Sequence, residues 1–235
     1  MKNIIWDKES YQEFLKYLYS LQDLKYRDFH SSLGINKEYL IGVRTPILKK
    51  IAMDISNGDY NDFIKLNKHD TYEETIIHGL IIGYLKIDFN IVITLLEDYI
   101  PHIDNWALCD LVCSNLHIWN KNTKTGLTFV KKALKSENQW FKRVGIVLLL
   151  DYYINDDYID YILNTFETYN SDEYYVIMAI AWLLSICYIK YPDKTSVLLK
   201  KKVLKKEIQN KTIQKIRESN RVGKDIKQRI LKWRI

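Results

Sequence analysis

The stretch NQWFKRVGIVLLLDYYI, residues 138–154, is matched without a gap 35 residues later by EYYVIMAIAWLLSICYI, residues 173–189. Both begin with polar or aromatic residues and continue as a long apolar run, which is typical of a buried helix. A third stretch of this layout, EETIIHGLIIGYL, begins at Glu73. Amphipathic segments lie between these stretches, at residues 92–99, 125–134 and 158–168. A repeat of about 35 residues that holds two helices predicts an all-α fold, an α-solenoid of about six helix pairs.

Composition supports this fold class. The 235 residues include 47% hydrophobic residues but only eight glycines and three prolines, which favours helices over a turn-rich β fold. No stretch reads as an interdomain linker, so we predict a single domain over residues 1–235. The start, MKNIIWDKES, is charged where a signal peptide would be apolar, and the longest uncharged run, residues 174–189, is short for a membrane span. We therefore expect a cytoplasmic protein with no membrane segment.

Metal and cofactor motifs are absent from the sequence. The three cysteines have no CxxC spacing and are expected to be reduced core residues, and the five histidines form no HxxxH pair. Neither GxGxxG nor GxxxxGK[ST] occurs, so nucleotide-dependent chemistry has no support. We expect no metal and no cofactor.

The basic charge is concentrated at the C-terminus. From Lys200 onward there are 14 basic and three acidic residues, a net charge of +11, whereas the preceding chain carries −5 of the total of +6. A basic segment indicates a polyanionic partner, nucleic acid first, although a charge-rich terminal helix can also be a solvated face.

One helical stretch, DNWALCDLVCSNLHIW at residues 104–119, combines an indole with a carboxylate. A spacing of four places Trp106 and Asp110 on one face, while the face carrying Leu108, Leu111 and Val112 is expected to be buried. Trp106 and Asp110 are therefore candidate site residues. The alternative is that Asp110 caps or pairs with a neighbouring helix and Trp106 belongs to the core.

Polar residues that precede apolar runs predict where helices begin. Asp104, Asn138 and Asp172 each stand just before a predicted buried helix, and Thr45 precedes Pro46 at the start of another. Such side chains accept hydrogen bonds from the first free N–H groups of a helix, so we expect these four residues to be caps.

Four motifs together resemble the AlkD-like DNA glycosylases, which are proteins of HEAT-like helical repeats. They are GVRTP at residues 42–46, the WxxxD of Trp106 and Asp110, WFKRVGIVLL with Arg143, and MAIAWLL with Trp182, in the family's order over nearly the whole chain. The resemblance implies excision of N3- and N7-alkylated purines from DNA. It also implies that Trp106, Asp110 and Trp182 form the catalytic cleft and that Arg143 holds the DNA backbone.

The residue types suit that reaction. An alkylated purine is already cationic, so it leaves without much general acid, and the remaining task is to stabilise an oxocarbenium-like sugar. A carboxylate such as Asp110 can do so and can orient the attacking water, while indoles add cation–π contact. Most enzymes that act on a base must first rotate it out of the stack, but the family is understood to work without a deep base pocket.

The sequence also departs from the family. Met178 and Ser185 stand on either side of Trp182, where basic residues would be expected, and the C-terminal lysines with Arg221 can compensate. The residues expected to bind DNA are Arg143, Lys142, Arg44 and Arg221.

Alternatives remain for these residues and for the function. Arg143 could instead pair with Asp151 or Glu137, and Trp182 could be core. We expect a monomer acting on double-stranded DNA that contains alkylated purines. The alternative is a non-catalytic helical-repeat scaffold that binds DNA or protein.

Overall fold

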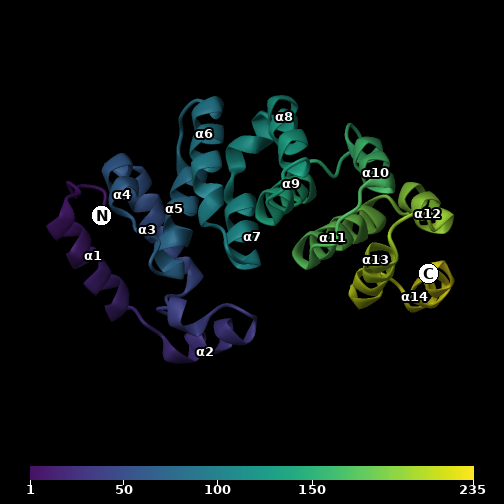
Figure 1. Ribbon diagram of the computed structural model, residues 1–235, viewed down its shortest axis with the longest axis horizontal. Helices are drawn as coiled ribbons and strands as arrows, with labels where there is room; N and C mark the ends of the chain where they lie inside the picture. Colours follow the sequence, from purple (N-terminus) through teal and green to yellow (C-terminus); the bar gives the residue numbers. More distant parts are fainter. The chain divides into compact units, whose positions relative to one another are not determined.

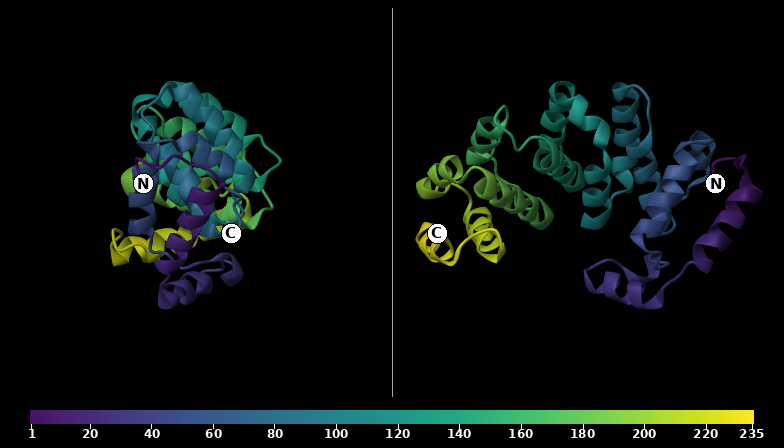
Figure 2. Two further views of the ribbon diagram at one scale, coloured as in Figure 1. Left: turned by 90° about the vertical axis from the view of Figure 1, so that its left-hand side faces the viewer. Right: turned by 180° about the vertical axis from the view of Figure 1, so that it is seen from behind.

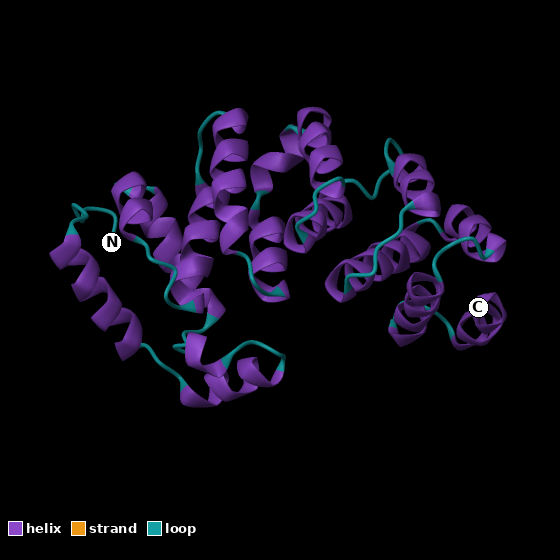
Figure 3. Cartoon of the chain, in the orientation of Figure 1, coloured by secondary structure: helices purple, strands orange, loops and turns teal.

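The computed structural model describes residues 1–235 and contains 14 α-helices, four short 3₁₀ helices and no strand (Figure 1, Figure 3). The predicted all-α fold class is confirmed. The chain divides into two compact units, Met1–Ile118 and Trp119–Ile235. Each unit is described by itself, and the single domain stays a prediction.

The first unit contains seven α-helices and two complete 3₁₀ helices. They are α1 (Lys8–Ser20), α2 (Leu24–Ser32), η1 (Lys37–Tyr39), α3 (Thr45–Ser56), α4 (Tyr60–Leu66), α5 (Tyr72–Tyr84), α6 (Phe89–Tyr99), η2 (Ile100–His102) and α7 (Trp106–Asn115). A further 3₁₀ helix, η3 (His117–Lys121), spans the boundary between the units.

Helices α3, α5 and α7 form the central row of the first unit. Helix α5 packs against both α3 and α7, while α4 and α6 pack on the outer side of α3 and α5 (Figure 1). The view from behind shows the same row (Figure 2). Every residue from 72 to 83 of α5 is buried, which explains why its apolar residues surround the helix instead of forming one stripe.

The GVRTP motif is a loop that wraps around a buried carboxylate of α5. Glu73 is 1% exposed and accepts hydrogen bonds from three consecutive backbone N–H groups, those of Ile41 (2.9 Å), Gly42 (2.7 Å) and Val43 (3.0 Å). Burial raises the pKa of Glu73, and the three N–H donors oppose that rise. Gly42 has φ +101°, and a Cβ there would lie 2.8 Å from the carbonyl oxygen of Asp23, so the loop requires glycine at this position.

The second unit contains the other seven α-helices and one complete 3₁₀ helix. They are α8 (Thr123–Leu134), α9 (Gln139–Tyr152), α10 (Ile159–Thr168), α11 (Tyr174–Lys190), α12 (Pro192–Lys201), α13 (Lys206–Glu218), α14 (Lys224–Arg229) and η4 (Ile230–Trp233).

The second unit has the same plan as the first. Helix α11 packs between α9 and α13, and α8, α10 and α12 lie on the outer side of this row (Figure 1). Helices α9 and α11 begin at Gln139 and Tyr174, which is the spacing of 35 that the sequence showed. The helical-repeat character of the fold is thereby confirmed within each unit.

Three of the four predicted caps are wrong. Asn138 caps α9, but α7 is capped by Asn105, whose side chain also donates to Asp104 at 2.7 Å. Asp172 pairs with Lys205 instead of capping α11. Thr45 is the first residue of α3, and its hydroxyl hydrogen-bonds to that of Tyr26. Neighbouring polar residues can serve equally well as caps, so the backbone angles of the connection decide which one does.

Two further expectations from the sequence concern burial. The cysteines Cys109, Cys113 and Cys187 are buried and form no disulfide, as predicted. No helix combines the length and the apolar character that crossing a membrane would require.

Candidate functional site

The first candidate residues lie at the start of α7. The Asn105 side chain accepts hydrogen bonds from the N–H groups of Ala107 (3.0 Å) and Leu108 (3.1 Å), which fixes the first turn and places Trp106 at its beginning. The Trp106 indole is partly exposed, and its Nε1 donates to the carbonyl oxygen of Leu33 at 3.3 Å. The indole is thus attached to the C-terminal end of α2 and does not belong to the core.

Asp110 stands one turn further along α7 and is also partly exposed. The opposite side of the helix packs into the unit through Leu108 and Val112, as predicted. Leu111 was expected on that buried side but is partly exposed, since its position around the helix lies between those of Asp110 and Leu108. The structure therefore brings an indole and a carboxylate together on the less buried side of one helix.

Three histidines form a cluster close to the start of α7, and the sequence did not reveal it. The rings of His69 and His102 stack with centroids 3.7 Å apart and an interplanar angle of 10°. Nδ1 of His78 lies 3.3 Å from Nε2 of His69, and Nδ1 of His69 lies 3.3 Å from the Thr75 hydroxyl, which also contacts the Tyr39 hydroxyl at 2.6 Å. The cluster joins the connection before α5 to the connection before α7.

Burial lowers the pKa values of these histidines. Together with the charges of the neighbouring imidazoles, it brings the pKa of His78 to about 3 and that of His69 to about 4. It also lowers the pKa of His102. His69 adopts φ +58°, a conformation that non-glycine residues rarely take. No three His, Cys, Asp or Glu side chains in residues 1–235 are placed to hold a metal ion.

The candidate cations of α9 in the second unit are engaged with α11. Lys142 forms an ion pair with Glu173 at 2.9 Å, and the Ser171 hydroxyl donates to the same carboxylate oxygen at 2.9 Å. Arg143 is only 5% exposed, and its Nη1 donates to the carbonyl oxygen of Tyr175 at 2.7 Å. In this arrangement both side chains hold the first turn of α11.

Trp182 lies on the less buried stripe of α11. Tyr175, Met178 and Trp182 are all partly exposed at spacings of three and four, so they share one side of the helix. Ser185, in contrast, is 3% exposed, and its hydroxyl donates to the Trp182 carbonyl oxygen at 2.7 Å. A basic residue at position 185 would therefore point into the core, whereas one at position 178 would lie beside the indole.

The two remaining candidates are arginines outside these helices. Arg44 forms an ion pair with Asp23 at 2.7 Å, and its guanidinium carbon lies 5.5 Å from the centroid of the Tyr26 ring. Arg221 is exposed in the connection between α13 and α14. Of the candidates, Arg44, Trp106 and Asp110 belong to the first unit, and the other four to the second.

The motifs and the helical repeat lead to a comparison with known proteins. A family model described as DNA alkylation repair enzyme matches residues 9–219, which is most of the chain. The chain belongs to this family. Membership of the DNA alkylation repair family assigns the protein a role in the repair of alkylated DNA, with DNA as its substrate. A search of curated proteins found no match.

Proposed function

We propose that the protein is a DNA glycosylase that hydrolyses the N-glycosidic bond of N3- and N7-alkylated purines, such as 3-methyladenine and 7-methylguanine, as the first step of base excision repair. The observation that carries this proposal is the pair of Trp106 and Asp110, one turn apart on the less buried side of α7. Membership of the DNA alkylation repair family supports the substrate class.

Asp110 is the proposed catalytic carboxylate. Departure of a cationic purine neutralises the base and leaves positive charge on the sugar, so a carboxylate beside the sugar is stabilising mainly in the transition state. The same oxygens can accept a proton from the attacking water. Trp106 and Trp182 are proposed to contact the cationic sugar or base through their ring faces.

Arg143, Lys142, Arg44 and Arg221 are the proposed contacts to DNA phosphates. Three of these cations already bind protein groups: Lys142 binds Glu173, Arg143 binds the Tyr175 carbonyl oxygen, and Arg44 binds Asp23. A phosphate must compete with those partners, whereas Arg221 has an exposed side chain. We therefore expect the basic C-terminal segment to supply much of the affinity for DNA.

The test is single-turnover release of base from a duplex that contains N7-methylguanine or N3-methyladenine. Asp110→Asn keeps the shape of the side chain but removes its charge, so release should fall by about 10² to 10³ while DNA binding changes little. Asp104→Asn is the matched control, because it removes a carboxylate just before the same helix, and it should release base within about twofold of the wild-type rate.

Two outcomes would reject the proposal. One is a wild-type rate no faster than spontaneous depurination of the same duplex. The other is an Asp110→Asn rate equal to that of wild type. In either case the non-catalytic scaffold that binds DNA or protein becomes the better description.

A further inference from the structure

The second unit contains a cavity that the proposed glycosylase reaction does not use. Its volume is about 470 Å³, and its walls come from the C-terminal end of α11, from α12, and from α14 with η4. The charged lining consists of three cations, Lys200, Arg229 and Lys232, and one carboxylate, Asp193. The cavity therefore carries an excess of positive charge.

The three cations of the cavity differ from other lysines of the same unit. Outward-facing lysines of α12 pair with carboxylates of α10: Lys194 with Asp160 at 2.8 Å, and Lys201 with Glu167 at 2.6 Å. The cations of the cavity form no ion pair within 4 Å. On the side of α12 that faces the cavity, in contrast, Asp193 is the one carboxylate among three cations, so a net positive charge remains.

The wall made by the C-terminus is held by four hydrogen bonds, of which the two of Gln209 are buried. Gln209 of α13 is 0% exposed, and its Nε2 donates to the carbonyl oxygens of Leu199 and Trp233, both at 2.8 Å. The side chain of Asn210 exchanges two hydrogen bonds with the backbone of Ile235, at 2.8 and 3.1 Å. Because the wall is fixed before any ligand arrives, a ligand would lose little affinity to ordering of the site.

Aromatic rings form the inner part of the cavity. The ammonium of Lys200 lies 5.6 Å from the centroid of the Trp233 ring, and the Trp233 ring meets Tyr188 edge to face at 6.3 Å. The indole thus holds one cation in place at the mouth of a partly apolar recess. Such a recess suits an anionic group that is attached to an apolar or aromatic body.

The cavity lies on a different side of α11 from the proposed catalytic indole. Tyr188 follows Trp182 by six residues, which corresponds to a rotation of about 120° between the two side chains around the helix. Tyr188 is 5% exposed and faces α12 and η4, whereas Trp182 belongs to the partly exposed stripe with Tyr175 and Met178. A ligand in the cavity would therefore not occupy the surface around Trp182.

We propose that this cavity, which we call the C-terminal basic cavity, binds one or two nucleotides of a DNA strand away from the lesion, with Lys200, Arg229 and Lys232 on the phosphates. The volume lies within the range of about 300 to 1,000 Å³ that is usual for ligand sites, so it exceeds the needs of a single phosphate ion. A family that acts on DNA supplies the partner, and the uncompensated charge supplies the affinity. The contact does not depend on the glycosylase chemistry.

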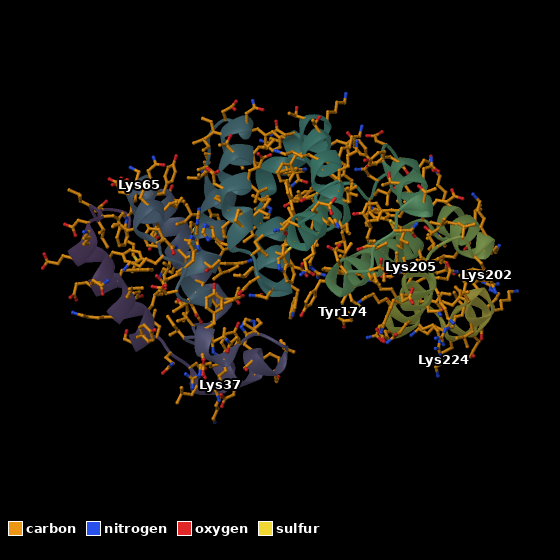
Figure 4. All side chains as sticks on the ribbon, in the orientation of Figure 1. Lys37, Lys65, Tyr174, Lys202, Lys205 and Lys224 are labelled. Atoms are coloured by element: carbon orange, nitrogen blue, oxygen red, sulfur yellow. The ribbon has the colours of Figure 1, made fainter.

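The test compares two double variants in the segment formed by α14 and η4. Arg229→Gln with Lys232→Gln removes two cations of the cavity, and Lys224→Gln with Lys227→Gln removes two cations of α14 outside its lining. Lys224 is labelled in Figure 4. Anisotropy with an undamaged duplex and with a single strand, at about 50 and 200 mM salt, measures the affinity and its salt dependence.

The cavity variant should bind DNA about tenfold more weakly than wild type. Its affinity should also depend less steeply on salt, by the equivalent of about one to two phosphate contacts. The affinity of the control variant should stay within about threefold of wild type. Equal losses in the two variants, or no loss in either, would overturn the proposal. The thermal midpoints of both variants are expected to equal that of wild type, because all four substituted residues lie on the surface.

A second arm distinguishes DNA from free phosphate compounds. Pyrophosphate is added to wild type and to the cavity variant, and the thermal midpoints are compared. If pyrophosphate stabilises only the wild type while the two proteins bind DNA equally, the cavity takes a small polyphosphate and the DNA proposal fails. The anisotropy measurement does not depend on base release, so a failed base-release test would leave its result standing, and failure here and failure of the glycosylase proposal are separable.

Discussion

The first unit buries two carboxylates inside its helix packing, whereas no carboxylate of the second unit is buried. Glu73 and Glu74 are 1% and 2% exposed, and their carboxylates accept hydrogen bonds from backbone N–H groups and from hydroxyls, such as that of Tyr11 at 2.6 Å from Glu74. In the second unit the carboxylates pair with lysines such as Lys194 and Lys201. Buried carboxylates therefore serve the stability of the first unit, whereas the carboxylates of the second unit form ion pairs nearer its surface.

The largest expected effect is on stability. Glu73→Ala leaves three buried N–H groups without an acceptor, so the free energy of unfolding should fall by about 3 to 5 kcal/mol. Glu173→Ala removes a half-buried ion pair in the second unit and should cost only about 1 kcal/mol. Urea unfolding of the two variants measures both values. If both variants lost the same free energy of unfolding, the two units would not differ in how much their carboxylates contribute to stability.

The next effect concerns the indoles. Trp106→Ala and Trp182→Ala should each slow base release by about tenfold, because a cation–π contact contributes about 1 to 2 kcal/mol, and both should be milder than Asp110→Asn. Single-turnover rates at saturating enzyme separate this loss from weaker binding. An effect of Trp182→Ala on affinity alone would make the second unit a binding unit only.

The next prediction concerns Arg143, a buried cation that is also a proposed contact to DNA phosphates. Arg143→Ala should weaken binding to damaged and undamaged duplexes by the same factor, about three- to tenfold, because a phosphate contact carries no information on the lesion. Wild-type affinity should also fall steeply between about 50 and 200 mM salt. Since Arg143 holds the Tyr175 carbonyl oxygen, the thermal midpoint is measured alongside; a lower midpoint with unchanged affinity would assign Arg143 to structure alone.

A separate test is the effect of pH on the histidine cluster of the first unit. The pKa values of His69 and His78 in the folded protein, about 4 and about 3, lie below the ordinary value of 6.5, so the unfolded chain takes up protons first as the pH falls. Their contribution to stability is complete above pH 6.5 and decreases as the pH falls through the folded values.

His78→Asn keeps a hydrogen-bond donor near the Nδ1 position but does not titrate. Its urea midpoint should therefore decrease less than that of wild type between pH 7 and pH 4. A pH dependence identical to that of wild type would show that His78 does not take part in this linkage.

Local patterns in the sequence predicted the helices well. The repeat of 35 residues placed the starts of α9 and α11, and the period of 3.6 placed Trp106 and Asp110 on one side of α7. These features depend on neighbours along the chain. The misplaced caps, with Asn105 in the place of Asp104, show the limit of such patterns, because the choice between adjacent polar residues depends on backbone angles.

Contacts between distant residues could not be predicted from the sequence. Glu73 binds N–H groups 30 to 32 residues away, and the stacked pair of His69 and His102 comes from two separate connections. Lys142 binds Glu173 across 31 residues, which the repeat would have suggested only if α9 and α11 were already known to be neighbours. Helix packing decides each of these contacts, and a single sequence carries no direct sign of it.

The loop around Glu73 has a further consequence. Successive backbone N–H groups that converge on one point are a common way for proteins to bind phosphate. Here the chain fills that position with a carboxylate of its own, so the backbone N–H groups of this loop are not available to a DNA phosphate, and the proposed contact of the loop is the Arg44 side chain alone. Removing Glu73 would open an unoccupied anion site, and sulfate or phosphate in the buffer should then restore part of the lost stability. Such rescue by a simple ion would show that the fold of this loop depends on an anion there and does not require that the anion belong to the chain.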